Sequence, residues 1–206
     1  MVASSNQPAA LRHGEVIETS TVGFVAESDR LHHLPQLGEL VRARINDDWT
    51  AFAVVAFGET GAIDQGRRAV RRGSPESADA DVYQRHPELD HILRTVFHAA
   101  AVGYDSERGI QHTLPPLPVP LHFGVQPCPP SDVARFCKNP QYLSALLAFH
   151  GEVNTEQLLA AHLRWVDANL DDEHAWLRDA CRLLARLMRR EYDRLVLILE
   201  SVDPDR

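Results

Sequence analysis

Histidine and cysteine are the residue types in this chain best suited to chemistry, because both bind metals and both take part in nucleophilic catalysis. The sequence holds eleven histidines and three cysteines. His112, His122 and Cys128 could converge on a metal ion if 122–128 is a strand, since positions 122 and 128 would then share a face. No HExxH, CxxC or HxH pairing accompanies them. We therefore expect scattered polar or partly buried histidines, no metal site and no cofactor.

Nucleophilic catalysis has equally little support. The chain has three cysteines, Cys128, Cys137 and Cys181. Their number is odd and no CxxC pair is present, which indicates reduced thiols rather than a disulfide framework. A histidine could activate any of them, but a free cysteine usually behaves as a small buried hydrophobic residue. Serine chemistry lacks a GxSxG motif. The sequence predicts no catalytic residue.

ATP hydrolysis through a phosphate-binding loop requires glycines and a lysine that the chain does not offer. All but one of the 21 basic residues are arginines, and the single lysine, Lys138, lies in FCKNP without neighbouring glycines. No GxxxxGK[ST] motif is present. We expect the chain neither to bind nor to hydrolyse ATP.

Two sets of arginines could contact a partner or phosphates. One set lies among the glycines of residues 58–73 and consists of Arg67, Arg68, Arg71 and Arg72. The other includes Arg182 and Arg186 on one face of the last predicted helix. Asp179 and Asp193 share that helix face, and no aromatic residues are interspersed with the loop arginines. A solvated, partly ion-paired surface is the favoured interpretation, and phosphate contact is the alternative.

The pattern of residue types along the chain predicts strands in the N-terminal part and helices in the C-terminal part. Residues 15–57 contain strand-like runs, including LVRARI from Leu40 and the buried run WTAFAVVAF from Trp49. Residues 58–73 read as a loop or arm, and residues 75–95 as two helical pieces. Strand texture returns at 96–105 and again at 122–128. Beyond Pro130 we expect helices, with Asn139 and Asn154 as N-caps.

The last predicted helix begins near Asp171–Glu173 and extends to about Ser201, which corresponds to about 40 Å. Its apolar residues fall within one arc. So long an apolar arc exceeds what a small domain can cover, so we expect self-association through this helix, the barrel or both. The expected contact residues are Leu177, Leu184, Met188, Leu195 and Leu199.

A family resemblance rests on the order of short segments. GEVIETSTVGFVAE, LPQLGELVRA and AFAVVAFGETGAIDQGRRAVRRG, followed by LPPLPVPLHFGVQPC, resemble the stand-alone bacterial HAS-barrel proteins. Their barrel is shared with HerA-type DNA translocases and with catalytic-ring subunits of ATP synthases, where it helps hold the ring of subunits together. The resemblance covers about residues 13–165. It implies a six-stranded barrel with late strands at 96–105 and 122–128, and it supplies no catalytic residues.

The sequence thus predicts an α+β fold: a loose N-terminus (1–12), a HAS-like barrel (13–128) with a helical arm or insert at 58–95, and a C-terminal helical domain (129–206). The expected function is a non-enzymatic, homo-oligomerising interaction module, an accessory of a HerA-like ATPase or DNA-processing complex. A nucleic-acid-binding module using both arginine sets is the alternative, and a metal-dependent hydrolase is the weakest hypothesis. The net charge of −8 argues against a surface that binds nucleic acid throughout. Without a long apolar run or a leader-like N-terminus, we expect a cytoplasmic protein and no membrane partner.

Overall fold

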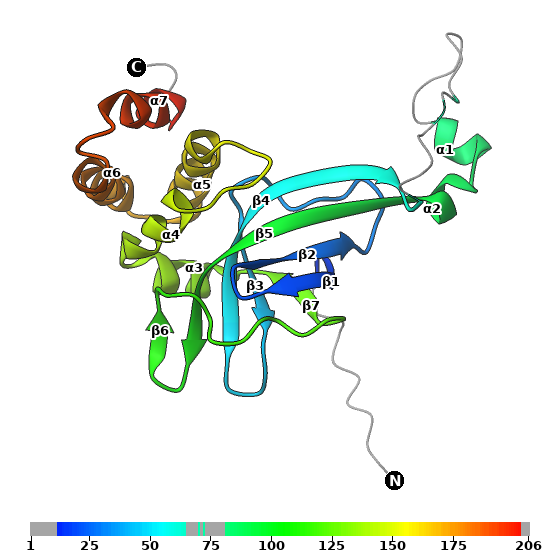
Figure 1. Ribbon diagram of the computed structural model, residues 1–206, viewed down its shortest axis with the longest axis horizontal. Helices are drawn as coiled ribbons and strands as arrows, with labels where there is room; N and C mark the ends of the chain where they lie inside the picture. Colours follow the sequence, from blue (N-terminus) through cyan, green and yellow to red (C-terminus); the bar gives the residue numbers. More distant parts are fainter. Residues whose placement is uncertain (1–11, 65–69, 71, 73–80, 203–206) are drawn as a thin grey trace.

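The computed structural model describes residues 12–64, 70, 72 and 81–202. This part of the chain is α+β, as predicted, with strands in the N-terminal part and helices in the C-terminal part (Figure 1). The strands are β1 (Gly14–Ser20), β2 (Gly23–Ser28), β3 (Leu40–Arg44), β4 (Thr50–Ala62), β5 (Leu93–Ser106), β6 (Gly109–Gln111) and β7 (Gly124–Pro127). The helices are α1 (Asp81–Arg85), α2 (Leu89–Ile92), α3 (Pro130–Cys137), η1 (Pro140–Tyr142), α4 (Leu143–Leu147), α5 (Thr155–Asn169), α6 (Ala175–Leu187) and α7 (Tyr192–Val202).

Six antiparallel strands close into a barrel. Their order is β2-β1-β7-β3-β4-β5, and the pairing of β2 with β5 completes the circle. β6 lies outside this circle and forms a hairpin with β5. The predicted six-stranded barrel is confirmed, and the late strand segments at 96–105 and 122–128 provide most of β5 and all of β7.

Strand β4 is apolar on both faces because a second layer packs outside the barrel. Ala53 and Val55 belong to the cluster inside the barrel, whereas Phe52 and Val54 belong to the cluster beneath the helices. The Phe52 ring lies 4.5 Å from the ring of Phe136 in α3, measured between centroids. This explains why WTAFAVVAF is a continuous apolar run rather than the alternation of a strand with one face in water.

A buried chain of hydrogen bonds joins α5 to the barrel. His162 Nδ1 lies 2.7 Å from the carbonyl oxygen of Gly38, and the side chain is fully buried. A carbonyl only accepts, so Nδ1 bears the proton; burial lowers the pKa of His162 to about 4, which leaves Nε2 as an acceptor. Tyr142 Oη, 2.9 Å away, therefore donates to Nε2. Its only proton is then used, so the Cys137 thiol, 3.3 Å from Tyr142 Oη, donates to that oxygen.

The prediction of a single long C-terminal helix is wrong. Helix α6 ends at Leu187, a turn follows, and α7 begins at Tyr192. The N–H of Glu191 donates to the carbonyl of Met188 at 2.8 Å within this turn. No glycine or proline marks the break in the sequence. The break is a tertiary effect, since it lets Leu195 and Ile198 of α7 bury themselves in the same core as α5.

The arm is a paired ribbon for much of its length rather than a loop from residue 58. β4 continues to Ala62 and β5 begins at Leu93, with the pairs Gly58↔Phe97 and Ala62↔Leu93. Inter-strand hydrogen bonds override the low strand propensity of the glycines here. The ribbon extends from the barrel to α1 and α2 at one end of the molecule, while α3–α7 lie at the other end (Figure 1).

Both predicted N-caps are confirmed. Asn139 accepts a hydrogen bond from the N–H of Gln141 at 3.1 Å, and Asn154 accepts one from Gln157 at 2.9 Å. Within the described ranges, no helix combines the length and the apolar character needed to span a membrane.

Candidate functional site

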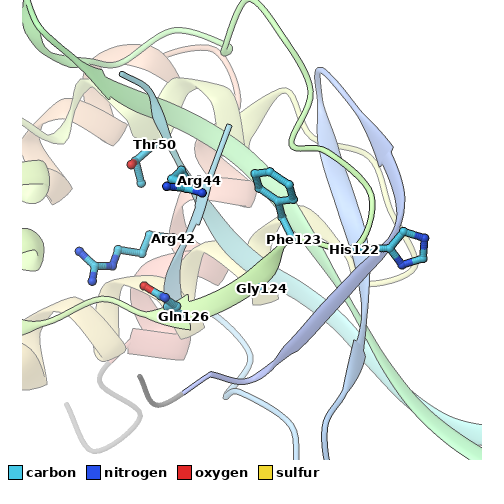
Figure 2. Close-up of a pocket in the computed structure, with 7 residues that line it drawn as sticks. All are labelled: Arg42, Arg44, Thr50, His122, Phe123, Gly124 and Gln126. Carbon is cyan, nitrogen blue, oxygen red and sulfur yellow. The ribbon is translucent and has the colours of Figure 1, made fainter. Parts of the chain in front are cut away.

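A basic groove lies on the outer surface of the barrel, where β3 runs beside β7. We call it the barrel groove; it has a volume of about 540 Å³ and is lined by Arg42, Arg44, Thr50, His122, Phe123, Gly124 and Gln126 (Figure 2). Arg42 and Arg44 alternate with the buried Val41 and Ala43, so both arginines face outward.

Strand pairing places the other lining residues. Gln126 of β7 pairs with Arg42, and Thr50 of β4 pairs with Arg44. These registers bring together groups from the neighbouring strands β3 and β4 and from β7, which is about eighty residues further along the chain. Figure 2 shows the Phe123 ring beside the Arg44 side chain, with Gln126 near Arg42.

The two arginines differ in how firmly they are held. Arg42 Nη1 lies 2.6 Å from Asp132 Oδ2 of α3, and the Asp132 side chain is only 15% exposed, so this ion pair orients Arg42. The buried Nε of Arg42 has no hydrogen-bond partner among the described residues. Arg44 Nη1 lies 3.5 Å from the fully exposed Asp47, a weak pair in water, and its Cζ lies 5.8 Å from the Phe123 ring centroid.

His122 stands at the edge of the barrel groove with its backbone in the left-handed region, at φ 67°. Its N–H donates to the carbonyl of Val16 at 2.8 Å, which fixes the turn before β7. Its Nδ1 lies 2.8 Å from Glu15 Oε1, so the imidazole turns toward β1. The lining itself contains no carboxylate. It offers guanidinium, amide and hydroxyl donors beside one aromatic ring, which is a surface suited to anions.

A second cavity, of about 530 Å³, lies at the tip of the ribbon, and we call it the arm cavity. Its lining is mainly apolar and comprises Ala62, Ile63, Asp64, Val70, Arg72, Val82, Tyr83, Leu89, His91, Ile92 and Leu93. Ile63 is 49% exposed, Val70 72% and Ile92 46%, which is unusual for large aliphatic side chains gathered in one place. The Tyr83 hydroxyl is hydrogen-bonded to His32 Nε2, which ties α1 to the loop between β2 and β3.

The described members of the two predicted arginine sets do not lie together. Arg67, Arg68 and Arg71 lie outside the described residues. Arg72 Nη1 lies 3.5 Å from Glu88 Oε1 beside α2, and Arg182 Nη1 lies 2.8 Å from Asp179 Oδ1 on α6, where Arg186 follows one turn later. Helices α2 and α6 are at opposite ends of the molecule (Figure 1).

The predicted contact residues of the last helix mostly face the chain's own core. Leu184, Met188 and Leu195 are 0%, 2% and 7% exposed, and Leu177 packs partly buried against the same cluster. Leu199 is 38% exposed. The turn between α6 and α7 folds the apolar arc onto α5, so the arc no longer argues for a second subunit.

The candidate metal ligands do not gather at one point. His112 Nε2 lies 3.0 Å from the carbonyl oxygen of Phe136, whereas His122 is paired with Glu15. Among residues 12–64, 70, 72 and 81–202, no group of three histidine, cysteine or acidic side chains could hold a metal ion.

The thiols are held in their protonated form. Burial is the main cause in each case: it raises the pKa of Cys137 to about 12 and also raises the pKa of Cys128 and of Cys181. A thiol needs a lowered pKa to be a nucleophile near neutral pH. These environments therefore favour packing over reactivity.

The barrel groove was missed by reasoning from the sequence. The alternation of Arg42 and Arg44 in LVRARI was visible, but it predicted only a strand. Phe123 and Gln126 lie some eighty residues further on and reach the arginines only through the pairing of β3 with β7. The groove could have been found by combining the polar residues on the outer faces of neighbouring strands, once the strand order was known.

No family model matches the chain, and no curated protein matches it in sequence. The HAS-barrel family therefore remains a resemblance, whereas the closed six-stranded barrel is a property of the structure.

Proposed function

We propose that this protein is a non-enzymatic interaction module that self-associates through the arm cavity and serves as an accessory of a HerA-like ring ATPase or another DNA-processing complex. The observation that supports self-association is the position of the arm cavity. It presents exposed aliphatic side chains at the end of a ribbon that projects from a closed barrel (Figure 1). A closed barrel has few free strand edges through which copies can pair, and the projecting arm offers exposed apolar surface instead.

A second copy of the chain is the occupant that the charges favour. In a twofold contact the same patch meets itself, so a patch of one sign would repel its own copy. The arm instead carries both signs in neighbouring pairs. Arg72 Nη1 lies 3.5 Å from Glu88 Oε1, and Arg85 Nη2 lies 3.7 Å from Asp81 Oδ2. An apolar centre with mixed charges around it is the composition of a self-complementary interface.

The resemblance to the HAS barrel supports the second half of the proposal. In the ring ATPases that barrel helps hold neighbouring subunits together, and a stand-alone copy without a P-loop would keep this role alone. The protonated thiols and the dispersed histidines fit a binding protein better than a hydrolase. The nucleic-acid alternative based on the arginine sets has less support, because Arg72 lies beside α2 and Arg182 lies on α6, at opposite ends of the molecule, so they do not share one surface.

The experiment compares the masses of two charge variants by light scattering. Ile92→Asp puts a carboxylate into the arm cavity, and Leu197→Asp makes the same kind of change at a 54% exposed leucine of α7. Because both side chains are half exposed, both variants should fold, which a thermal melt verifies. We expect Ile92→Asp to be monomeric at concentrations where the wild type and Leu197→Asp are oligomeric.

Equal masses for all three proteins would contradict the arm as the contact. Loss of the oligomer in Leu197→Asp alone would move the interface to the helical end. The partnership with a ring ATPase is tested separately, by purifying the tagged protein from its native cell and identifying what accompanies it. Recovery of no translocase or other DNA-processing protein would contradict that half.

A further inference from the structure

We propose that the barrel groove binds single-stranded nucleic acid, with Arg42 and Arg44 contacting phosphates and Phe123 stacking against a base. The inference goes beyond self-association and does not depend on it, because the groove lies on the barrel wall and the arm cavity lies at the tip of the ribbon.

Charge is the first argument. The chain has a net charge of −8, yet the groove lining has two arginines and no carboxylate. Arg42 donates through Nη1 to Asp132, so its guanidinium is already fixed at the groove wall and loses little side-chain entropy on binding. Arg44 has as its only ion-pair partner in the described chain the exposed Asp47 at 3.5 Å, which a phosphate can displace at small cost. Gln126 and Thr50 add neutral donors beside the two arginines.

The aromatic ring is the second argument, and it distinguishes a nucleic-acid strand from a bare anion. Phe123 is partly exposed, and the Arg44 Cζ lies 5.8 Å from its ring centroid. A ring and a guanidinium plane are the two flat surfaces on which proteins stack unpaired bases. The Phe123 ring also packs against the cluster inside the barrel, and a free phosphate would use the arginines without contacting the part of the ring that is exposed. Paired bases cannot reach such a ring, so a single strand is the fitting form.

A neighbouring cavity at the end of the barrel shows what makes the groove distinct. It has a volume of about 380 Å³ and also contains an arginine and aromatic rings, Arg108 with Trp49 and Tyr104. Asp48 and Glu107 line it as well. Those carboxylates would repel a phosphate backbone, whereas the barrel groove has none in its lining. The carboxylates that pair with the groove arginines, Asp132 and Asp47, lie outside the lining, so the lining itself presents guanidinium groups beside an aromatic ring.

Fluorescence anisotropy with a labelled oligothymidylate tests the proposal on the full chain. Two phosphate contacts predict that the logarithm of the association constant falls with the logarithm of salt with a slope of about −1.4 between about 50 and 200 mM. Arg44→Gln should reduce the slope by about 0.7. Phe123→Leu should weaken binding by about tenfold and leave the slope unchanged.

Controls separate the groove from charge in general and from misfolding. Arg30→Gln removes the same charge from an exposed arginine of the loop after β2 and should bind like the wild type. Arg44 is preferred to Arg42 for substitution because Asp132 pairs with Arg42 and holds α3. A thermal melt of each variant shows whether it is folded; if Phe123→Leu melts early, Phe123→Tyr, which keeps a ring, should bind like the wild type.

Three results would overturn the proposal. The first is no binding at about 50 mM salt. The second is equal competition by inorganic polyphosphate or by polyglutamate together with unchanged binding by Phe123→Leu, which would mean that the groove senses charge alone. The third is a loss of binding in Arg182→Gln and Arg186→Gln but not in Arg44→Gln, which would place the nucleic acid on α6 instead.

Discussion

Replacing Tyr142 by Phe should destabilise the protein without changing its shape. Phenylalanine fills the same space, so no cavity opens, but the hydroxyl that donates to His162 Nε2 at 2.9 Å is lost. His162 is fully buried and Nε2 then has no donor; the Cys137 thiol loses its acceptor as well. An unsatisfied buried acceptor costs about 1–3 kcal/mol, so we expect a loss near 2 kcal/mol. For a chain of this size that corresponds to a fall in Tm of about 4–8 °C.

Urea denaturation followed by circular dichroism measures this loss directly. Tyr192→Phe is the matched control, because Tyr192 is 72% exposed and its change should alter stability by less than about 0.5 kcal/mol. The chemical shifts of the His162 ring nitrogens give a second measurement, with the proton expected on Nδ1. If Tyr142→Phe and Tyr192→Phe have the same stability, or if the proton is found on Nε2, the assigned hydrogen-bond chain is wrong.

Three further predictions concern stability. The pKa of His162 is lowered to about 4 by burial, whereas an unfolded histidine titrates near 6.5, so between pH 6.5 and 4 the unfolded chain binds the extra proton first. The part of the stability that depends on His162 should therefore fall by up to about 1.4 kcal/mol per pH unit as the pH is lowered through this range, and should not fall further below pH 4. Urea midpoints across this range should show a pH dependence that His162→Gln lacks. Gly38→Ala should unfold the chain or lower its Tm by more than about 10 °C, because φ at Gly38 is +85° and an added Cβ would lie 2.5 Å from the backbone N of His162; an unchanged melt would show that the loop relaxes. Replacing Arg67, Arg68, Arg71 and Arg72 by Ser should change stability by about 0.5 kcal/mol each or less, and a collapsed transition would mean that they are buried and paired.

The barrel could be predicted because its signals are local or nearly so. WTAFAVVAF and LVRARI have strand periodicity in their own residues, and Asn154 marks the start of α5 by its cap alone. The arm is different. Gly58 and Gly61 indicate a loop in isolation, and only pairing with β5 makes them strand. Hydrogen bonds to a partner about forty residues away decided this segment, and no local propensity contains that information.

The break between α6 and α7 and the barrel groove could not be predicted from the sequence for a similar reason. The apolar arc is continuous in sequence through Met188, so periodicity alone favours one helix. Burial of Leu195 against the chain's own core favours two shorter helices, because α7 must fold back toward α5. Arg42 and Phe123 likewise come together only through the register of β3 and β7. The sequence therefore predicts which residues are apolar or basic, whereas the strand order determines which of them meet.

Sedimentation equilibrium of the wild-type chain across micromolar concentrations tests the central claim most directly, because the proposed function requires that one copy binds another. The chain mass is 23.1 kDa. We predict an integer multiple of that mass, dissociating on dilution and abolished by Ile92→Asp. A mass of 23.1 kDa at every concentration would contradict self-association and with it the role proposed for the arm.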